Sequence, residues 1–337
     1  MDSLSIENEI KQHRDTSLDA VCGLLIIYMI LCHAFGWSGT TEDSFYRCIS
    51  RVLFFFMPWF FYKSGMFYTR SDAKSIMYSS KKLIFPYLFY SIVGELVRWY
   101  DLFFIKGKVD VVDYVLSPLK SLCMFGAIQS NAPLWFLLSL FFTKVVVSLS
   151  DRFNVSKIWL LLFSIVIFGF GSMLNEYRIP CWLFSTAGGI AFFVMGYMLK
   201  QKQHEHKVFI LSFIVFVLCV AMLPSNVDFR VDVVTDGYWI VYFISSLAGI
   251  IVFNNIFRLD LLKFPALTSI GRNSLSYYCL HWILFNIVVV VYNFKPYSSP
   301  DYLILFTLIT YSIVILPVIA HFTNFIKKKY PCIGVYL

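Results

Sequence analysis

The chain has 337 residues, of which 59% are hydrophobic, 19% are aromatic and only 14% are charged. An average soluble domain has about 25% charged residues, so this composition excludes an ordinary soluble protein. The net charge of +8 comes from basic residues at the ends of apolar runs rather than in one block, and we therefore predict no nucleic-acid partner.

Apolar runs near the length of a membrane span recur along the whole chain. We predict an all-α polytopic membrane protein, with one transmembrane domain over residues 1–337 and about ten transmembrane helices. If both termini are cytoplasmic, the inside segments carry about twice as many Lys and Arg residues as the outside segments, and we predict that orientation. The predicted spans are 18–38, 51–69, 82–105, 133–150, 157–174, 182–200, 207–224, 238–257, 273–293 and 302–322.

Ionisable side chains inside a span are costly, so each one suggests a function or a buried pair. The predicted spans contain His33, Lys63, Glu95, Arg98 and His281. His33 follows Cys22 by eleven residues, which places the two on nearly one helix face and about 16 Å apart. A neutral imidazole can take a proton from a hydroxyl near neutral pH. The alternative is a packing histidine, hydrogen-bonded between helices.

Six segments, in order along the chain, carry a recognisable pattern. They are SLDAVCGLLIIYMILCHAFGW (17–37), FFFMPWFFYKSGMFY (54–68), KKLIFPY (81–87), LWFLLSLF (134–141), FFVMGYML (192–199) and IGRNSLSYYCLHW (270–282). Together they resemble the acyltransferase 3 family, whose members are membrane enzymes that O-acylate sugars on bacterial surface polysaccharides and related acceptors.

The resemblance implies an O-acyltransferase in the cell membrane, here the bacterial plasma membrane. It would move an acyl group from acyl-coenzyme A to a hydroxyl of a polysaccharide or lipid-linked sugar; we expect acetyl, and the resemblance leaves acetyl and succinyl both open. The expected partners are therefore acyl-coenzyme A, with acetyl-CoA as the first choice, a carbohydrate acceptor and the lipid bilayer. The eight cysteines form no C-x-x-C pair, so we predict no metal site, and we expect no permanently bound cofactor.

The family's first span carries a basic residue, ten others and then a histidine. That histidine falls on His33, which the resemblance makes the candidate catalytic base, whereas Cys22 occupies the basic position. Lys63 lies about 9 Å from the cytoplasmic end of its span and Cys22 about 6 Å. We therefore expect Lys63 to supply the missing cation; a lysine that snorkels to the headgroups is the alternative.

Further residues are assigned to the two substrates. The family has basic residues at the cytoplasmic end of its third span, and Lys82 matches that position with Lys81 beside it. Both would attract the phosphates of acyl-coenzyme A, although lysines there also satisfy membrane topology. Asp228 and Arg230, in an outer loop rich in polar and aromatic residues, are the candidate groups for the sugar acceptor; ordinary loop solvation is the alternative.

Three remaining residues are expected to be structural. His281 matches a late histidine of the family, and we interpret it as a supporting residue rather than a base. Asp19 either caps the first span or pairs with a nearby cation. Trp135 is expected in the core or at the membrane interface.

Two other functions remain open from the sequence. A transporter or flippase of lipid-linked glycan or polysaccharide would also carry buried Lys and His residues along its path. The chain shows no inverted repeat in support of it. A membrane sensor or scaffold has no specific feature in its favour.

Overall fold

The computed structural model describes residues 15–69, 73–107, 110, 112–174, 180–222, 229, 238–297 and 300–329. Side chains are described for the same residues except 73–81, 113, 181, 324 and 326–328. Every regular element within these ranges is helical, which confirms the all-α prediction. Asp228, Arg230 and the side chain of Lys81 lie outside the described part, so their predicted roles stay predictions.

The described helices follow the predicted spans closely after residue 130. For example, the predicted spans 157–174 and 273–293 correspond to helices 157–173 and 274–292. The α-helices are α2 (Thr16–Trp37), α3 (Ser44–Leu53), α4 (Phe56–Met66), α5 (Ala73–Tyr100), α6 (Ser117–Phe125), α7 (Trp135–Arg152), α8 (Lys157–Met173), α9 (Cys181–Leu199), α10 (His206–Met222), α11 (Trp239–Ile256), α12 (Pro265–Arg272), α13 (Ser274–Tyr292) and α14 (Tyr302–Lys329). Short π-helical or 3₁₀ segments are η1 (Asp101–Ile105), η2 (Val112–Leu116), η3 (Gln129–Leu134), η4 (Lys202–His204) and η5 (Asp260–Leu262).

Six stretches of the described residues are long and apolar enough to cross a membrane. They are Thr16–Trp37, Tyr114–Arg152, Trp182–Leu199, Trp239–Ile256, Ser274–Tyr292 and Tyr302–Thr323, and α8 and α10 are apolar but shorter. The chain is therefore a multi-pass membrane protein, while the count of ten spans and the cytoplasmic termini stay predictions.

The region predicted as one span over 51–69 is divided. The first of its helices, α3, begins before it and ends at Leu53, and α4 begins at Phe56. Pro58 lies in the first turn of α4, where its missing N–H removes no helical hydrogen bond. The predicted outer segment 106–132 likewise contains η2, α6 and most of η3.

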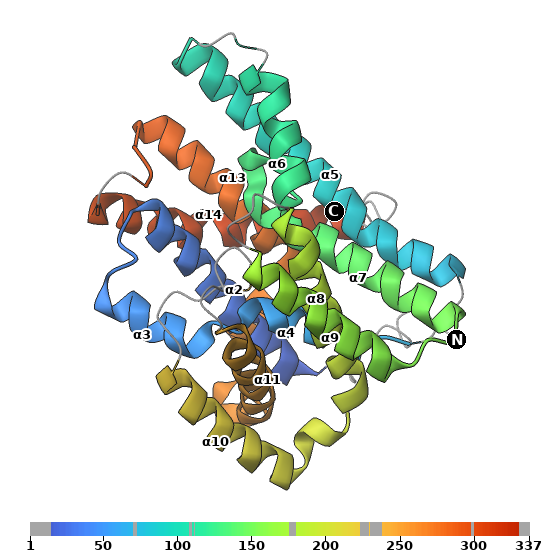
Figure 1. The fold of residues 1–337 in the computed structure, drawn as a ribbon. Coiled ribbons are helices and arrows are strands. Elements are labelled where there is room, and N and C mark those ends of the chain that lie inside the picture. The colour runs from blue at the N-terminus through green and yellow to red at the C-terminus, as the bar shows by residue number, and fades with distance from the viewer. Residues whose placement is uncertain are drawn as a thin grey trace.

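Helices α2 and α4 occupy the middle of the assembly, with α5 and α6 on one side and α10 and α11 on the other (Figure 1). Helix α2 packs most extensively against α12, and α4 against α9. The α4–α9 crossing depends on two glycines. A Cβ at Gly65 would lie 1.9 Å from the carbonyl oxygen of Phe193, and one at Gly196 would lie 2.1 Å from that of Tyr62.

The outer helices expose apolar side chains in continuous faces. On α8, Trp159, Phe163 and Val166 are each at least 65% exposed, and α14 shows a similar face with Phe306 and Ile313. Such faces would be unfavourable in water but match hydrocarbon. The polar and aromatic groups of the interior are therefore surrounded by lipid-facing surface.

Candidate functional site

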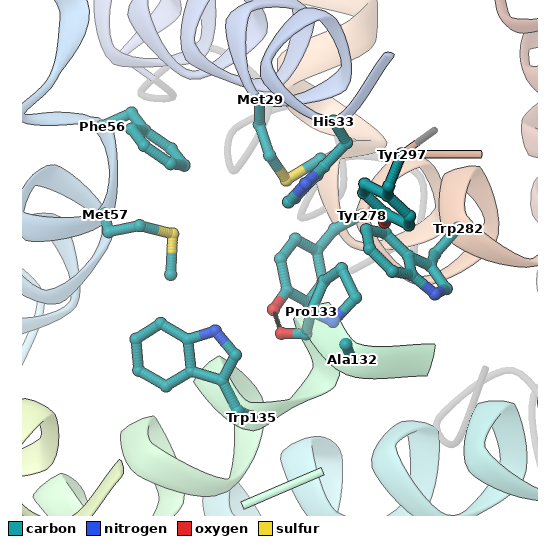
Figure 2. A pocket seen from close by; sticks show the side chains of 10 residues that line it. All are labelled: Met29, His33, Phe56, Met57, Ala132, Pro133, Trp135, Tyr278, Trp282 and Tyr297. Carbon is teal, nitrogen blue, oxygen red and sulfur yellow. Dashed lines mark hydrogen bonds between the residues drawn. The ribbon is translucent and has the colours of Figure 1, made fainter. Parts of the chain in front are cut away.

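A cavity of about 270 Å³ lies between α2, α4, α13 and the start of α7. Figure 2 shows the side chains of His33 and Met29, both from α2, directed toward a space that Trp135 and Tyr278 border from the other side. Its lining residues are Met29, His33, Phe56, Met57, Ala132, Pro133, Trp135, Tyr278, Trp282 and Tyr297. The histidine therefore faces a partly open space lined mostly by apolar and aromatic side chains.

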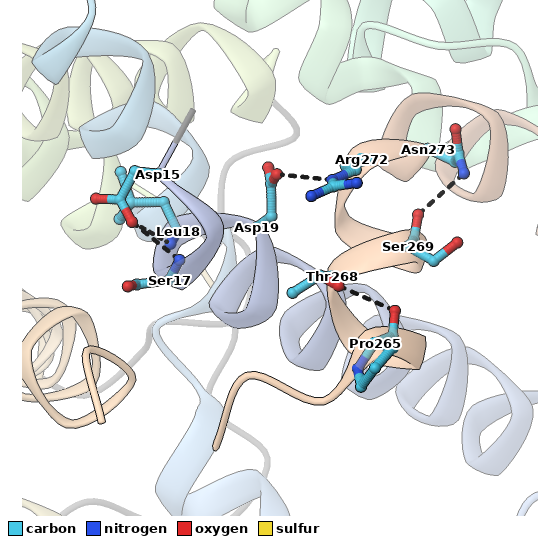
Figure 3. Close-up of polar contacts among 9 residues, drawn as sticks. All are labelled: Asp15, Ser17, Leu18, Asp19, Pro265, Thr268, Ser269, Arg272 and Asn273. Carbon is cyan, nitrogen blue, oxygen red and sulfur yellow. Dashed lines mark hydrogen bonds and ion pairs between the residues drawn. The ribbon is translucent and has the colours of Figure 1, made fainter. Parts of the chain in front are cut away.

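The helix that carries His33 is fixed at its opposite end (Figure 3). Asp15 caps α2, since its Oδ1 accepts hydrogen bonds from the backbone N–H groups of Ser17 and Leu18. Asp19 is instead paired with Arg272 of α12, with 3.3 Å between Oδ2 and Nε. Of the two roles considered for Asp19, pairing is confirmed and capping is wrong.

The backbones of α2 and α12 touch beside this ion pair. A Cβ on Gly23 would lie 2.0 Å from the carbonyl oxygen of Leu267, and one on Gly271 would lie 1.8 Å from that of Asp19. Glycine is therefore needed at both positions for this crossing. His33 lies seventeen residues beyond Thr16, the first residue of α2, so about 26 Å of helix separates it from this anchored end.

The opposite wall of the cavity, η3, is held by hydrogen bonds to α13. Asn131 donates from Nδ2 to the carbonyl oxygen of Cys279 at 3.1 Å. Asn286 donates to the carbonyl oxygen of Ser130 at 3.0 Å, and the Tyr278 hydroxyl donates to that of Pro133. Buried carbonyls that lose their partners are costly, so these bonds fix the non-helical backbone opposite His33.

We expect Tyr278→Phe to lower the free energy of unfolding by about 1–3 kcal/mol, because the buried carbonyl of Pro133 loses its hydroxyl donor. The measurement is thermal or denaturant unfolding in detergent. Tyr302→Phe is the matched control, since its hydroxyl contacts Asp43 at an exposed position. Equal losses in both variants would contradict the assigned role of the Tyr278 hydroxyl.

His33 lies among aromatic rings. Its ring is stacked on that of His281, with centroids 5.2 Å apart and planes 18° apart. Trp282 lies at a right angle to His33, with centroids 5.0 Å apart, and Trp37 contacts Trp282 in the same way. The packing therefore restricts the orientation of the imidazole at the cavity wall.

The proposed donor residues lie farther along the helices. Lys63 follows the cavity-lining Met57 by about 9 Å along α4, and its Nζ lies 5.0 Å from the ring of Trp59. Lys82 is exposed on α5 and near enough to Lys144 of α7 for their charges to interact. Arg272 is paired with Asp19, which precedes Cys22 by three residues on α2.

Sequence reasoning singled out His33 as a candidate, but it did not predict most of the residues that surround it. Tyr278 and Trp282 lie within one of the six family-like segments, and Pro133 lies directly before another. All three are far from His33 in the sequence, so the sequence did not predict that they share a cavity with it. Trp135 was expected in the core or at the interface, and it is buried at the cavity wall. No group of three or more His, Cys, Asp or Glu side chains in the described residues could hold a metal ion.

Comparison with curated protein sequences and with solved structures gave no significant match. A family profile described as an acyltransferase domain matches residues 15–321, which is nearly the whole chain and includes every residue that lines the cavity. With this match, and with its multi-pass helical fold, the chain belongs to the acyltransferase 3 family.

Proposed function

We propose that the protein is a membrane O-acyltransferase that moves an acyl group, acetyl in the first instance, from acyl-coenzyme A to a sugar hydroxyl. The observation that carries the proposal is the position of His33 on the wall of a partly open cavity, in a chain of an acyltransferase family. An imidazole there can exchange protons with a hydroxyl bound among the apolar and aromatic side chains of the cavity.

The proposed reaction is direct transfer. His33 accepts the proton of the sugar hydroxyl as its oxygen attacks the thioester carbonyl carbon. A carbon–oxygen bond forms, the carbon–sulfur bond breaks, and the leaving thiolate takes the proton back from the His33 imidazolium. Coenzyme A leaves as the thiol and His33 is neutral again. No Gly-x-Ser-x-Gly motif supports an acyl-serine route.

The size of the cavity limits what it holds. About 270 Å³ is at the low end for small-molecule sites, so it suits the thioester and one sugar unit but not the nucleotide of the donor. Trp135, Trp282 and Tyr297 offer ring faces and polar edges of the kind that contact carbohydrates. Asp228 and Arg230 remain the proposed residues for the rest of the acceptor.

The donor phosphates are assigned to the Lys81 and Lys82 end of α5. Gly94, on the same helix, lies against η3, which forms one wall of the cavity. A Cβ at Gly94 would lie 3.2 Å from the carbonyl oxygen of Ser130 in η3. Lys82 precedes Gly94 by twelve residues, or about 18 Å of helix. A donor whose thioester and phosphates are separated by a long flexible arm fits that spacing, and coenzyme A has such an arm. Lys63 is proposed to lie along this path.

Lys144 of α7 lies near enough to Lys82 for their charges to interact, and we propose that it joins the phosphate site. We expect Lys82→Met and Lys144→Met each to raise the KM for acyl-coenzyme A by about tenfold, because one charge-assisted contact to phosphate is lost. The expected kcat at saturating donor is near that of the wild type. Steady-state kinetics in detergent would measure both. Lys202→Met, at an exposed position in η4, is the matched control. A donor KM unchanged in both lysine variants would exclude this donor site.

The function is tested by NMR of the cell-surface polysaccharide from cells with and without the protein. Loss of one acyl signal without the protein, at unchanged polymer amount, would support the proposal and identify the acyl group. An unchanged acyl pattern with less surface polymer would favour a glycan transporter instead.

A further inference from the structure

One buried titratable residue beside the cavity has no part in the transfer described above. His281 of α13 is fully buried and its ring is stacked on His33. Its other neighbours are Phe285, whose ring is nearly perpendicular at 5.9 Å between centroids, and Tyr278 at 6.3 Å. The two histidines therefore lie face to face inside an aromatic enclosure.

The hydrogen bonds of His281 define its tautomer. Nδ1 lies 2.7 Å from the carbonyl oxygen of Tyr278 and 3.2 Å from that of Tyr277. Carbonyl oxygens only accept, so Nδ1 carries the proton. The other ring nitrogen, Nε2, is buried and has no hydrogen-bond partner in the described part of the chain. A proton there would create a buried positive charge without a counter-charge, which is strongly unfavourable.

We propose that His281 is a positioning residue for His33, and this rests on the proposed function. Its neutral ring sets the plane of the His33 imidazole and provides an aromatic face for the imidazolium that forms during transfer. Aromatic faces attract cations within about 6 Å, and the observed separation is 5.2 Å. A second charged ring at this distance would repel the imidazolium, so the locked neutral tautomer suits the role.

Few other groups at the cavity could compete for the proton. The titratable side chains of the cavity lining besides His33 are Tyr278, from α13, and Tyr297, from the segment after it. Phenols ionise only in the alkaline range. Neither α2, α4 nor the start of α7 places a carboxylate or lysine in this lining. At saturating donor, where protonation of the donor phosphates does not limit binding, a fall of kcat on acidification therefore reports on the histidines.

The test compares His281→Phe with His281→Gln. Phenylalanine keeps the flat ring without any titratable nitrogen, whereas glutamine keeps polar atoms without the ring. We expect His281→Phe to retain kcat within about threefold, and His281→Gln to lower kcat by about 100-fold at unchanged KM, the scale of loss from a misplaced reacting group. The acidic limb of the pH–rate profile is expected in both the wild type and His281→Phe, with His33→Ala as the reference for loss of the base.

Two results would overturn the proposal. One is a folded His281→Phe variant as impaired as His281→Gln; the other is a His281→Phe profile that lacks the acidic limb, because His281 would then itself titrate. If neither variant folds, NMR of histidine-labelled wild-type protein tests the proposal instead. An imidazolium signal from His281 near neutral pH would show that its ring is charged and would exclude the proposed neutral tautomer. Full activity of His33→Ala would refute the base at His33, whereas absence of acyl transfer by the folded wild-type protein would refute the proposed function instead.

Discussion

Replacing His33 with alanine is expected to lower kcat for acyl transfer by about 100- to 10,000-fold, the range that a general base contributes. The reason is that the sugar hydroxyl loses its proton acceptor at a cavity wall to which the described residues contribute no other histidine or carboxylate. The KM for the donor is expected to change little, because the proposed phosphate site lies about 18 Å along α5 from the level of the cavity. Initial rates with purified protein and labelled acyl-coenzyme A give both constants.

The control for this variant is His206→Ala, at the exposed start of α10. It removes an imidazole far from the cavity-lining residues and is expected to leave the rate unchanged. Unfolding curves separate a chemical defect from a folding defect, since His33 is only partly buried and its loss leaves α2 anchored by Asp19 and Arg272. A folded His33→Ala protein with wild-type kcat would refute a base at this position.

The sequence predicts helix positions well where an apolar run ends in charged residues. Helices α8 and α9 agree with the predicted spans within about one residue, because Lys157 opens the first and Lys200 follows the second. The prediction fails at 51–69, where the apolar run continues across Leu53–Phe56 and hydropathy cannot show the break. Pro58 was the available signal, since proline is favoured in the first turn of a helix.

The candidate site was only partly predictable, because contacts between distant helices cannot be read from local sequence patterns. The family motif singles out His33, but its neighbours His281 and Trp282 are about 250 residues away and contact it through helix packing. The break at Asn131, with φ −146° and ψ 65°, turns η3 toward the cavity and has no clear sequence signature. Asp19 was named with the right kind of partner, but the sequence did not identify Arg272.

The close backbone contact between α4 and α9 fixes the position of α4, which forms part of the cavity wall. The variant Gly65→Ala tests the importance of this contact. The added Cβ would lie 1.9 Å from the carbonyl oxygen of Phe193, far inside van der Waals contact, so the two helices have to separate. We expect a loss of about 3 kcal/mol or more in the free energy of unfolding, at the upper end of the usual cost of overpacking. Thermal unfolding in detergent measures it.

A substitution at Gly65 is expected to affect activity as well as stability, because α4 also carries Phe56 and Met57 of the cavity wall. The matched control is Gly36→Ala in α2, where a Cβ would meet nothing within 4 Å. That change is expected to be neutral or stabilising by about 0.5–1 kcal/mol, since alanine favours the helix. Equal stability of Gly65→Ala and Gly36→Ala would show that the α4–α9 crossing tolerates a side chain at position 65. In that case the close contact of the two helices would not be needed to hold Phe56 and Met57 opposite His33.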